Sequence, residues 1–259
     1  MKSSDAADLD RRFSGIGRLY GRQALDRFRL ARVCVVGIGG VGSWAAEALA
    51  RSAIGEITLI DLDMIAESNV NRQIHALGDQ FGRAKVATMA ERILSINPGC
   101  KVRVIEDFVT SDNLDEILGA NFDYIIDAID HVHTKAAMIA WCREKGVALV
   151  TAGAAGGKID PGQIKAADLA HTVQDPLLSK VRSLLRKEYG FTRDLKKKFG
   201  IPAVFSSEQP RKPVESAACV EPQRLDGISC SGFGSSVCIT AAFGFFAAGL
   251  VFNDLASSE

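Results

Sequence analysis

The chain has 259 residues, and its 31 lysines and arginines balance 31 aspartates and glutamates, so the formal net charge is zero. This length allows one large domain with its own core, and the balanced charge gives no global indication of a nucleic-acid partner. The six cysteines include no C-x-x-C pair, which argues against a zinc site and a disulfide framework and favours a reducing cytoplasm. The first ten residues are polar and charged, so no signal peptide is expected.

Residues 11–31 are rich in arginine and predict an amphipathic helical arm with a solvated face. The β-branched run that follows ends in a glycine turn, after which a helical pattern begins. Gly37, Gly39 and Gly42 match G-x-G-x-x-G, and Gly40 lies between them. Glycines let the backbone approach phosphate oxygens closely, and a helix N-terminus offers unpaired N–H groups. The motif also occurs in NAD-dependent oxidoreductases, and a glycine turn without a ligand remains a further alternative.

The residues after the glycines favour ATP over NAD. The next predicted strand ends at Asp61, about 20 residues past the glycines, where an acid binds ribose hydroxyls. Arg72 and Lys85 follow, and such cations can reach a triphosphate tail, which a nicotinamide cofactor lacks. Asp130 lies just past an apolar strand, at the edge where open parallel sheets bind ligands. A carboxylate there can hold the Mg²⁺ that accompanies ATP.

Strand and helix patterns alternate through residues 32–150. This alternation predicts an α/β fold with a doubly wound, mostly parallel, Rossmann-like sheet. Strands are expected at 32–37, 56–61, 101–106, 123–128 and 147–151, and helices at 41–52, 83–96, 111–119 and 133–145. His131 and His133 lie beside Asp130; they form either a metal pair or, as we favour, a cap on the next helix.

The alternation of strand and helix patterns ends after residue 151. A glycine-rich loop and a short strand near 163–165 follow. A basic cluster follows, which is either the solvated face of a helix or a surface for a polyanion. Its members are Lys180, Arg182, Arg186, Lys187, Arg193, Lys196, Lys197 and Lys198. Residues 206–230 are polar and contain three prolines, as in a mobile crossing loop.

The stretch 233–252 carries no charge over 20 residues, which reaches the length of a membrane span. Its glycines, serines and threonine suit close helix packing, so we favour a buried helix in the core or in a dimer interface. Membrane association through this stretch is the alternative. We expect three parts in the chain: an N-terminal arm at 1–31, an ATP-binding half at 32–160 and an acceptor-binding C-terminal half of the same domain at 161–259.

The motifs together resemble the E1-like (ThiF/MoeB/ubiquitin-activating) adenylyltransferase superfamily. The matching segments are 37–43, 50–55, 61–63, 68–73, Lys85 and 127–130. The resemblance implies the E1-like adenylation fold, a soluble homodimer and an arginine of the N-terminal arm, here Arg18, that enters the ATP site of the neighbouring subunit. It implies that Asp61 holds the ribose, Asp130 holds Mg²⁺, and Arg72 and Lys85 neutralise phosphates. Further implied nucleotide-binding residues are Arg51, Asp63, Asn69 and Gln73.

Segments 163–177, 204–208 and 232–244 resemble the tRNA threonylcarbamoyladenosine dehydratase branch of this superfamily. That branch implies ATP-dependent cyclisation of N6-threonylcarbamoyladenosine at position 37 of tRNA, through adenylation of the threonyl carboxylate. The alternative is an adenylyltransferase that activates the C-terminus of a sulfur-carrier or ubiquitin-like protein. Many such enzymes carry two C-x-x-C pairs, which this chain lacks. Cys219 and Cys230 could then act in a thioester or a sulfur relay, with a cysteine desulfurase or sulfur acceptor as partner.

Overall fold

The computed structural model describes residues 7–119, 121–212 and 233–257. Its centre is a seven-stranded sheet with the strand order β3-β2-β1-β4-β5-β7-β6. Neighbouring strands are parallel except for the antiparallel pair β6 and β7 at one end. The strands are β1 Arg32–Val36, β2 Glu56–Ile60, β3 Lys101–Ile105, β4 Tyr124–Asp127, β5 Ala148–Ala152, β6 Ile164–Asp168 and β7 Pro202–Ser206. The predicted mostly parallel α/β sheet is thereby confirmed.

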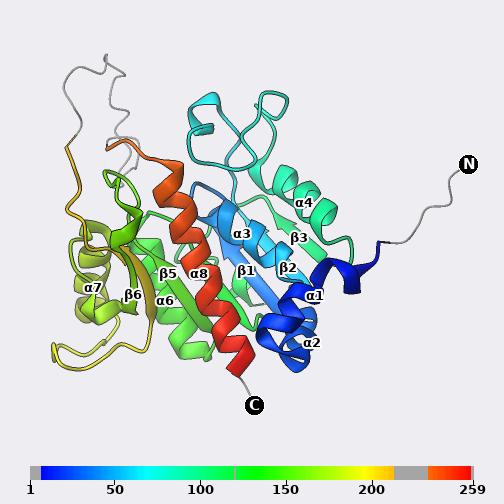
Figure 1. The fold of residues 1–259 in the computed structure, drawn as a ribbon. Coiled ribbons are helices and arrows are strands. Elements are labelled where there is room, and N and C mark those ends of the chain that lie inside the picture. The colour runs from blue at the N-terminus through cyan, green and yellow to red at the C-terminus, as the bar shows by residue number, and fades with distance from the viewer. Residues whose placement is uncertain (1–6, 120, 213–232, 258–259) are drawn as a thin grey trace, which may run out of the picture.

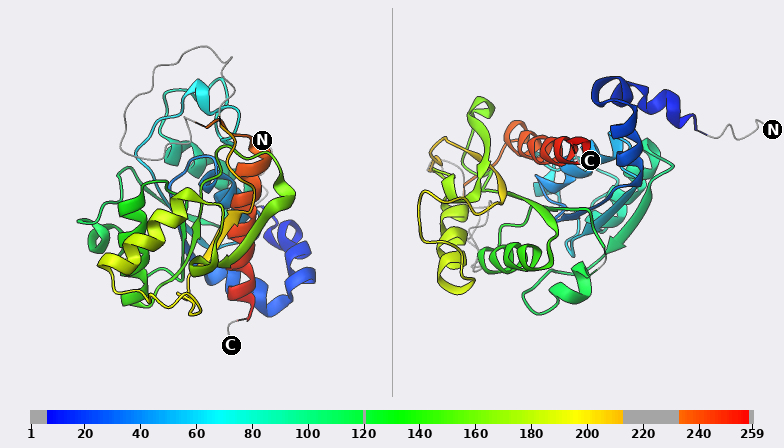
Figure 2. Two further views of the ribbon diagram at one scale, coloured as in Figure 1. Left: turned by 90° about the vertical axis from the view of Figure 1, so that its left-hand side faces the viewer. Right: turned by 90° about the horizontal axis from the view of Figure 1, so that it is seen from below.

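Helices cover both faces of the sheet, as Figures 1 and 2 show. One core contains side chains from α2, α3, α4 and α8, and the other contains side chains from α5, α6 and α7. The helices are α1 Leu9–Tyr20, α2 Arg22–Leu30, α3 Gly42–Arg51, α4 Lys85–Ile96, α5 Leu114–Leu118, α6 Val132–Lys145, α7 Pro176–Glu188 and α8 Val237–Ser257. Because helices cover both faces of the sheet, the side chains on both faces of the central strands are buried. The central strands are therefore continuous apolar runs in the sequence.

The register brings the carboxyl ends of four strands to one edge of the sheet. Val36 pairs with Ile60 on one side and Asp127 on the other, and Asp127 pairs with Thr151. We call this edge, with the loops that follow β1, β2, β4 and β5, the carboxyl edge. In parallel α/β sheets this is where ligands bind.

The uncharged stretch near the C-terminus forms most of α8. It is the helix of the described chain that is long and apolar enough to cross a membrane, yet half of its most apolar window is buried inside the fold. Helix α8 lies against α3 (Figure 1), and a Cβ on Gly244 would stand 2.5 Å from the Val41 carbonyl oxygen. At its other end, Arg27 of α2 donates to the backbone oxygens of Leu255 and Ala256. These contacts support the prediction of a packed helix in a soluble protein.

Candidate nucleotide site at the carboxyl edge

Backbone atoms pack closely against one another in the glycine turn between β1 and α3, as a phosphate-binding turn requires. Gly37 has a φ of +88°, a conformation that L side chains rarely adopt. A Cβ on Gly42 would lie 1.8 Å from the Gly37 carbonyl oxygen, so only glycine fits where the helix begins. Gly40 faces Arg72 and Thr240, whose side-chain carbons lie 3.3 and 3.2 Å from its ideal Cβ position. The turn therefore packs against Arg72 and against Thr240 of α8.

Asp61 fixes the conformation of this turn from the end of β2. One of its carboxylate oxygens accepts the Ile38 N–H at 2.6 Å, and the other accepts the Asp63 N–H at 2.8 Å. Burial raises the pKa of Asp61, and the Lys85 charge and these two N–H groups oppose that rise. Each oxygen retains acceptor capacity for a ribose hydroxyl.

Lys85 and Asp63 form an ion pair at the same edge. The Lys85 Nζ lies 2.7 Å from an Asp63 carboxylate oxygen, with the lysine side chain 7% exposed and the aspartate 56% exposed. Lys85 is the first residue of α4, and its backbone N–H donates to the Asp63 carbonyl. Asp63 therefore holds the nearly buried Lys85 side chain in place at this edge.

Arg72 lies on a segment that is anchored on both sides. Its backbone oxygen accepts the Trp44 indole N–H at 2.9 Å, which ties the segment to α3. Its Nη1 donates to the Ser68 carbonyl at 2.7 Å and to the Asn71 side chain at 2.9 Å. These bonds leave most of the guanidinium donors for a ligand.

Asn69 and Gln73 shape the same segment. The Asn69 side-chain oxygen accepts the Ala66 N–H at 3.0 Å, and the Asn69 carbonyl accepts the Gln73 N–H at 2.9 Å. The Gln73 side chain is 6% exposed, and its oxygen has no partner among the described residues. A buried amide without a partner is a polar group that a bound ligand or water can satisfy.

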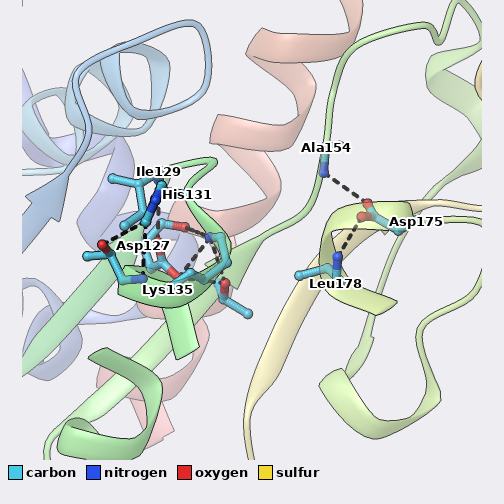
Figure 3. A network of polar contacts seen from close by, with 9 residues as sticks. Asp127, Ile129, His131, Lys135, Ala154, Asp175 and Leu178 are labelled. Atoms are coloured by element: carbon cyan, nitrogen blue, oxygen red, sulfur yellow. Dashed lines mark hydrogen bonds and ion pairs between the residues drawn. The ribbon is translucent and has the colours of Figure 1, made fainter. Parts of the chain in front are cut away.

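Asp130 follows β4, whose last residue, Asp127, belongs to a buried polar network (Figure 3). Lys135 on α6 lies 2.8 Å from Asp127, and both side chains are fully buried. Thr151 of β5 donates to Asp127 at 2.7 Å, and the Ile129 N–H donates to Asp127 at 3.3 Å. Burial raises the pKa of Asp127, and the Lys135 charge opposes this rise. The network fixes the loop that presents the exposed Asp130.

His131 caps α6, since its Nδ1 accepts the Thr134 N–H. The capping interpretation of this histidine is thereby confirmed. Within residues 7–119, 121–212 and 233–257, no group of three or more His, Cys, Asp or Glu residues could hold a metal ion. A single carboxylate such as Asp130 nonetheless fits Mg²⁺, which keeps several waters and binds through one or two carboxylates and substrate phosphates.

Two predicted nucleotide-binding residues are not brought to the glycine turn. Arg51 is the last residue of α3, roughly 14 Å along the helix from Gly42, and its Nε donates to Glu47 at 2.7 Å. Arg18 is exposed on α1, and the arm packs where β1 and β2 begin, since Gly55 donates its N–H to Phe28. Helix α1, which carries Arg18 in its last turn, therefore lies at the edge opposite to the glycine turn of its own chain (Figure 1).

Two buried groups that sequence reasoning missed connect the carboxyl edge to α7. Asp175 caps α7 by accepting the Leu178 N–H at 2.9 Å, and it accepts the Ala154 N–H of the loop after β5 at 2.9 Å (Figure 3). Lys158 is 1% exposed, and its Nζ donates to the backbone oxygens of Gln174, Ser206 and Glu208. The position of α7 is thereby fixed relative to β5 and β7.

The basic cluster lies on α7 and the loop that follows it. Ser179, Arg182, Ser183, Arg186, Lys187 and Arg193 line a cavity of about 560 Å³. Arg182 donates to the Thr172 hydroxyl, and Arg186 donates to the Thr192 carbonyl at 3.2 Å. These two arginines are therefore partly committed to the fold, whereas Lys187 and Arg193 are exposed. Cys219, Cys230 and most of the predicted crossing loop lie outside the described residues.

A glycine turn closed by an aspartate, with an arginine and a lysine at the same edge, defines a nucleotide-binding α/β protein. The model of the ThiF family matches residues 13–181, and the chain belongs to this family. It is similar to two proteins described as tRNA threonylcarbamoyladenosine dehydratase. The one from Haemophilus influenzae is 49% identical over 96% of this chain and 94% of its own length, and the one from Escherichia coli is 52% identical over 91% and 90%.

A solved structure agrees with these relatives. The crystal structure of the E. coli tRNA N6-threonylcarbamoyladenosine dehydratase, TcdA, in complex with ATP superposes with a TM-score of 0.87 at 48% identity. The match covers 96% of each chain. The resemblance to the E1-like superfamily and to its dehydratase branch, inferred from the motifs, is confirmed.

Proposed function

We propose that the chain catalyses the ATP-dependent cyclisation of N6-threonylcarbamoyladenosine at position 37 of tRNA. The observation that carries this proposal is similarity over nearly the full length to dehydratases of that name, including one solved with ATP. The glycine turn, Asp61, Arg72 and Lys85 supply the corresponding chemistry at the carboxyl edge.

In the proposed reaction, the threonyl carboxylate attacks the α-phosphate of ATP. An oxygen–phosphorus bond forms, the bond to pyrophosphate breaks, and an acyl-adenylate results. The ureido nitrogen then attacks the activated carbonyl and loses its proton, while AMP leaves with the carboxylate oxygen. The net change in the tRNA is the loss of one water. No protein nucleophile is needed, because the substrate brings its own carboxylate.

The protein positions the reactants and neutralises charge. The glycine turn and the first N–H groups of α3 receive phosphate oxygens, and Asp61 receives the ribose. Arg72 and Lys85 stabilise the charge that develops on the phosphates during attack. Asp130 would hold Mg²⁺, which supplies further positive charge to the phosphate oxygens. Asp63, Asn69 and Gln73 position these side chains.

The basic cluster on α7 and after it is the proposed tRNA docking surface. Its exposed lysines and arginines can neutralise backbone phosphates, and Asp175 links α7 directly to the loop after β5. We further propose a homodimer in which Arg18 reaches the carboxyl edge of the partner chain, because α1, which carries it, lies at the opposite edge in its own chain. Cytoplasmic localisation, and a sulfur-relay role of Cys219 and Cys230 with a desulfurase partner, remain predictions.

The experiment that tests this proposal is the exchange of labelled pyrophosphate into ATP. We expect exchange with tRNA that carries the threonylcarbamoyl group and none with the same tRNA lacking it. Mass spectrometry of the nucleosides should show the loss of one water from the modified adenosine. Exchange that needs a carrier protein with a diglycine C-terminus, and not modified tRNA, would instead establish a carrier-activating enzyme.

A further inference from the structure

A second cavity, of about 340 Å³, lies between α3 and α4. Its walls include Arg51 at the end of α3, Thr88 and Arg92 on α4, and His75 in the connection between Arg72 and α4. No residue of the glycine turn lines it. It is therefore separate from the place where the carboxyl edge would receive the nucleotide.

Two nearly buried side chains of this cavity have polar atoms without partners. His75 is 2% exposed and Thr88 is 7% exposed. The two ring nitrogens of His75 and the hydroxyl of Thr88 all lack a hydrogen-bond partner within the described chain. Buried polar groups in native proteins are nearly always satisfied, so three such atoms at one cavity indicate an occupant that supplies the missing bonds.

The charges of Arg51, Arg92 and Arg83 balance those of Glu47, Glu91 and Asp79 around the cavity, but the guanidinium groups between α3 and α4 outnumber the carboxylate that holds them. Buried Glu47 accepts the Arg51 Nε at 2.7 Å and the Arg92 Nε and Nη2 at 2.7 and 3.0 Å, so two guanidinium groups share one carboxylate. The acidic side chains at the rim are Glu91, which pairs with Arg83, and Asp79, whose charge also acts on Arg83. The remaining guanidinium donors of Arg51 and Arg92 are available to a ligand.

His75 is neutral in this setting. Burial, together with the charges of Lys85 and Arg92, lowers the pKa of His75 to about 4. At neutral pH the ring therefore has one N–H donor and one acceptor nitrogen. The cavity thus offers a ring N–H, a threonine hydroxyl and two fixed guanidinium groups, which are all donors to oxygen.

We propose that this cavity is a binding site for a small phosphate-class oxyanion, distinct from the nucleotide site. Arg51 and Arg92 neutralise the charge of the anion, and His75 and Thr88 donate to its oxygens. Phosphate-class anions suit planar guanidinium groups particularly well because the donor fork matches their oxygens. Inorganic phosphate and pyrophosphate share this chemistry, and the test below separates them.

The histidine resonances of the full-length protein provide a local readout, since the chain has only four histidines. The His75 signal is assigned with His75→Gln and followed during titration with phosphate, pyrophosphate or acetate at constant ionic strength. We expect a saturable shift with phosphate or pyrophosphate, whichever fits, and none with acetate. Arg51→Gln and Thr88→Val should each weaken binding about tenfold, and Thr88→Ser should restore it.

Arg72→Ala is the matched control, because it removes a cation from the carboxyl edge and leaves this cavity intact. Its binding should equal that of the wild type. Unfolding midpoints in phosphate-free buffer check that each variant folds, and Thr88→Val should not lower the midpoint, because it removes an unpartnered buried hydroxyl. The proposal is overturned by the lack of a saturable His75 shift, by an equal response to acetate, or by loss of the shift in Arg72→Ala.

Discussion

The Lys135 ammonium in the first turn of α6 lies 2.8 Å from the carboxylate of Asp127, the last residue of β4, and both side chains are completely buried. Removing one partner leaves an uncompensated charge in the core, at a cost of about 3–5 kcal/mol. We therefore expect Lys135→Met and Asp127→Asn to lower the free energy of unfolding by about this amount. Urea unfolding measures it.

The exposed pair of Lys101 and Glu56 is the matched control for this buried pair. Its side chains are 76% and 23% exposed, and such pairs contribute only about 0–1 kcal/mol. Lys101→Met should therefore leave stability nearly unchanged. Equal effects of Lys101→Met and Lys135→Met would show that the buried pair has no special role.

A second prediction concerns the cations of the carboxyl edge. Arg72→Ala and Lys85→Ala should each reduce pyrophosphate exchange strongly while the far-UV and near-UV spectra stay native. Each removes a charge-assisted phosphate contact worth about 1.5–3 kcal/mol per hydrogen bond, so a loss of about 10- to 150-fold is expected. Arg103→Ala, on the edge strand β3, serves as the control. Normal exchange in both variants would refute the assigned roles.

The trans role of Arg18 can be tested by complementation. Arg18→Ala and Arg72→Ala chains are each expected to be nearly inactive. In a two-fold dimer, a mixed pair contains one site with both arginines intact, so random reassortment restores activity to about a quarter of the wild-type level. If Arg18 acted only within its own chain, mixing would restore nothing. Analytical ultracentrifugation of the mixture confirms the dimer.

The docking surface predicts a specific salt dependence. Reversing Lys187, Arg193 and Lys197 to Glu should weaken tRNA binding at least tenfold and reduce the slope of affinity against salt, because fewer counterions are released. ATP affinity should be unchanged. Arg182 and Arg186 are left intact because they bond Thr172 and Thr192 in the fold.

Three reversals remote from α7 form the control for this experiment: Arg22, Lys101 and Arg103. They change the net charge equally, so a general loss of positive potential would weaken tRNA binding in both variants. Selective loss in the α7 variant would identify the surface. Unchanged cyclisation in that variant would move the docking surface elsewhere and leave the adenylation chemistry standing.

Local sequence patterns predicted most of the sheet. The strand ending near Ile60 and the helix over 133–145 follow from β-branched runs and helical periodicity, and the structure places them within a few residues. The glycine turn could also be predicted from the sequence, because the spacing of its glycines follows from the close approach of the backbone at Gly37 and Gly42. Such features depend on neighbours in the chain, which a sequence displays directly.

Features that depend on distant contacts could not be read in this way. Lys135 and Lys158 look like ordinary surface lysines until the fold surrounds them. Arg51 matches a family segment, yet the length of α3 carries it away from the turn. The antiparallel pairing of β6 with β7 depends on how the chain returns to the sheet, and neither strand specifies this alone.

The close contact of Gly244 with the start of α3 has a consequence for biosynthesis. The glycine turn is synthesised about 200 residues before the helix that packs on it. During translation the first half of the chain therefore emerges without one wall of its nucleotide cradle, and contacts of such long sequence separation form late. A nascent or prematurely terminated chain would carry the glycine motif but lack the wall that α8 adds to the site.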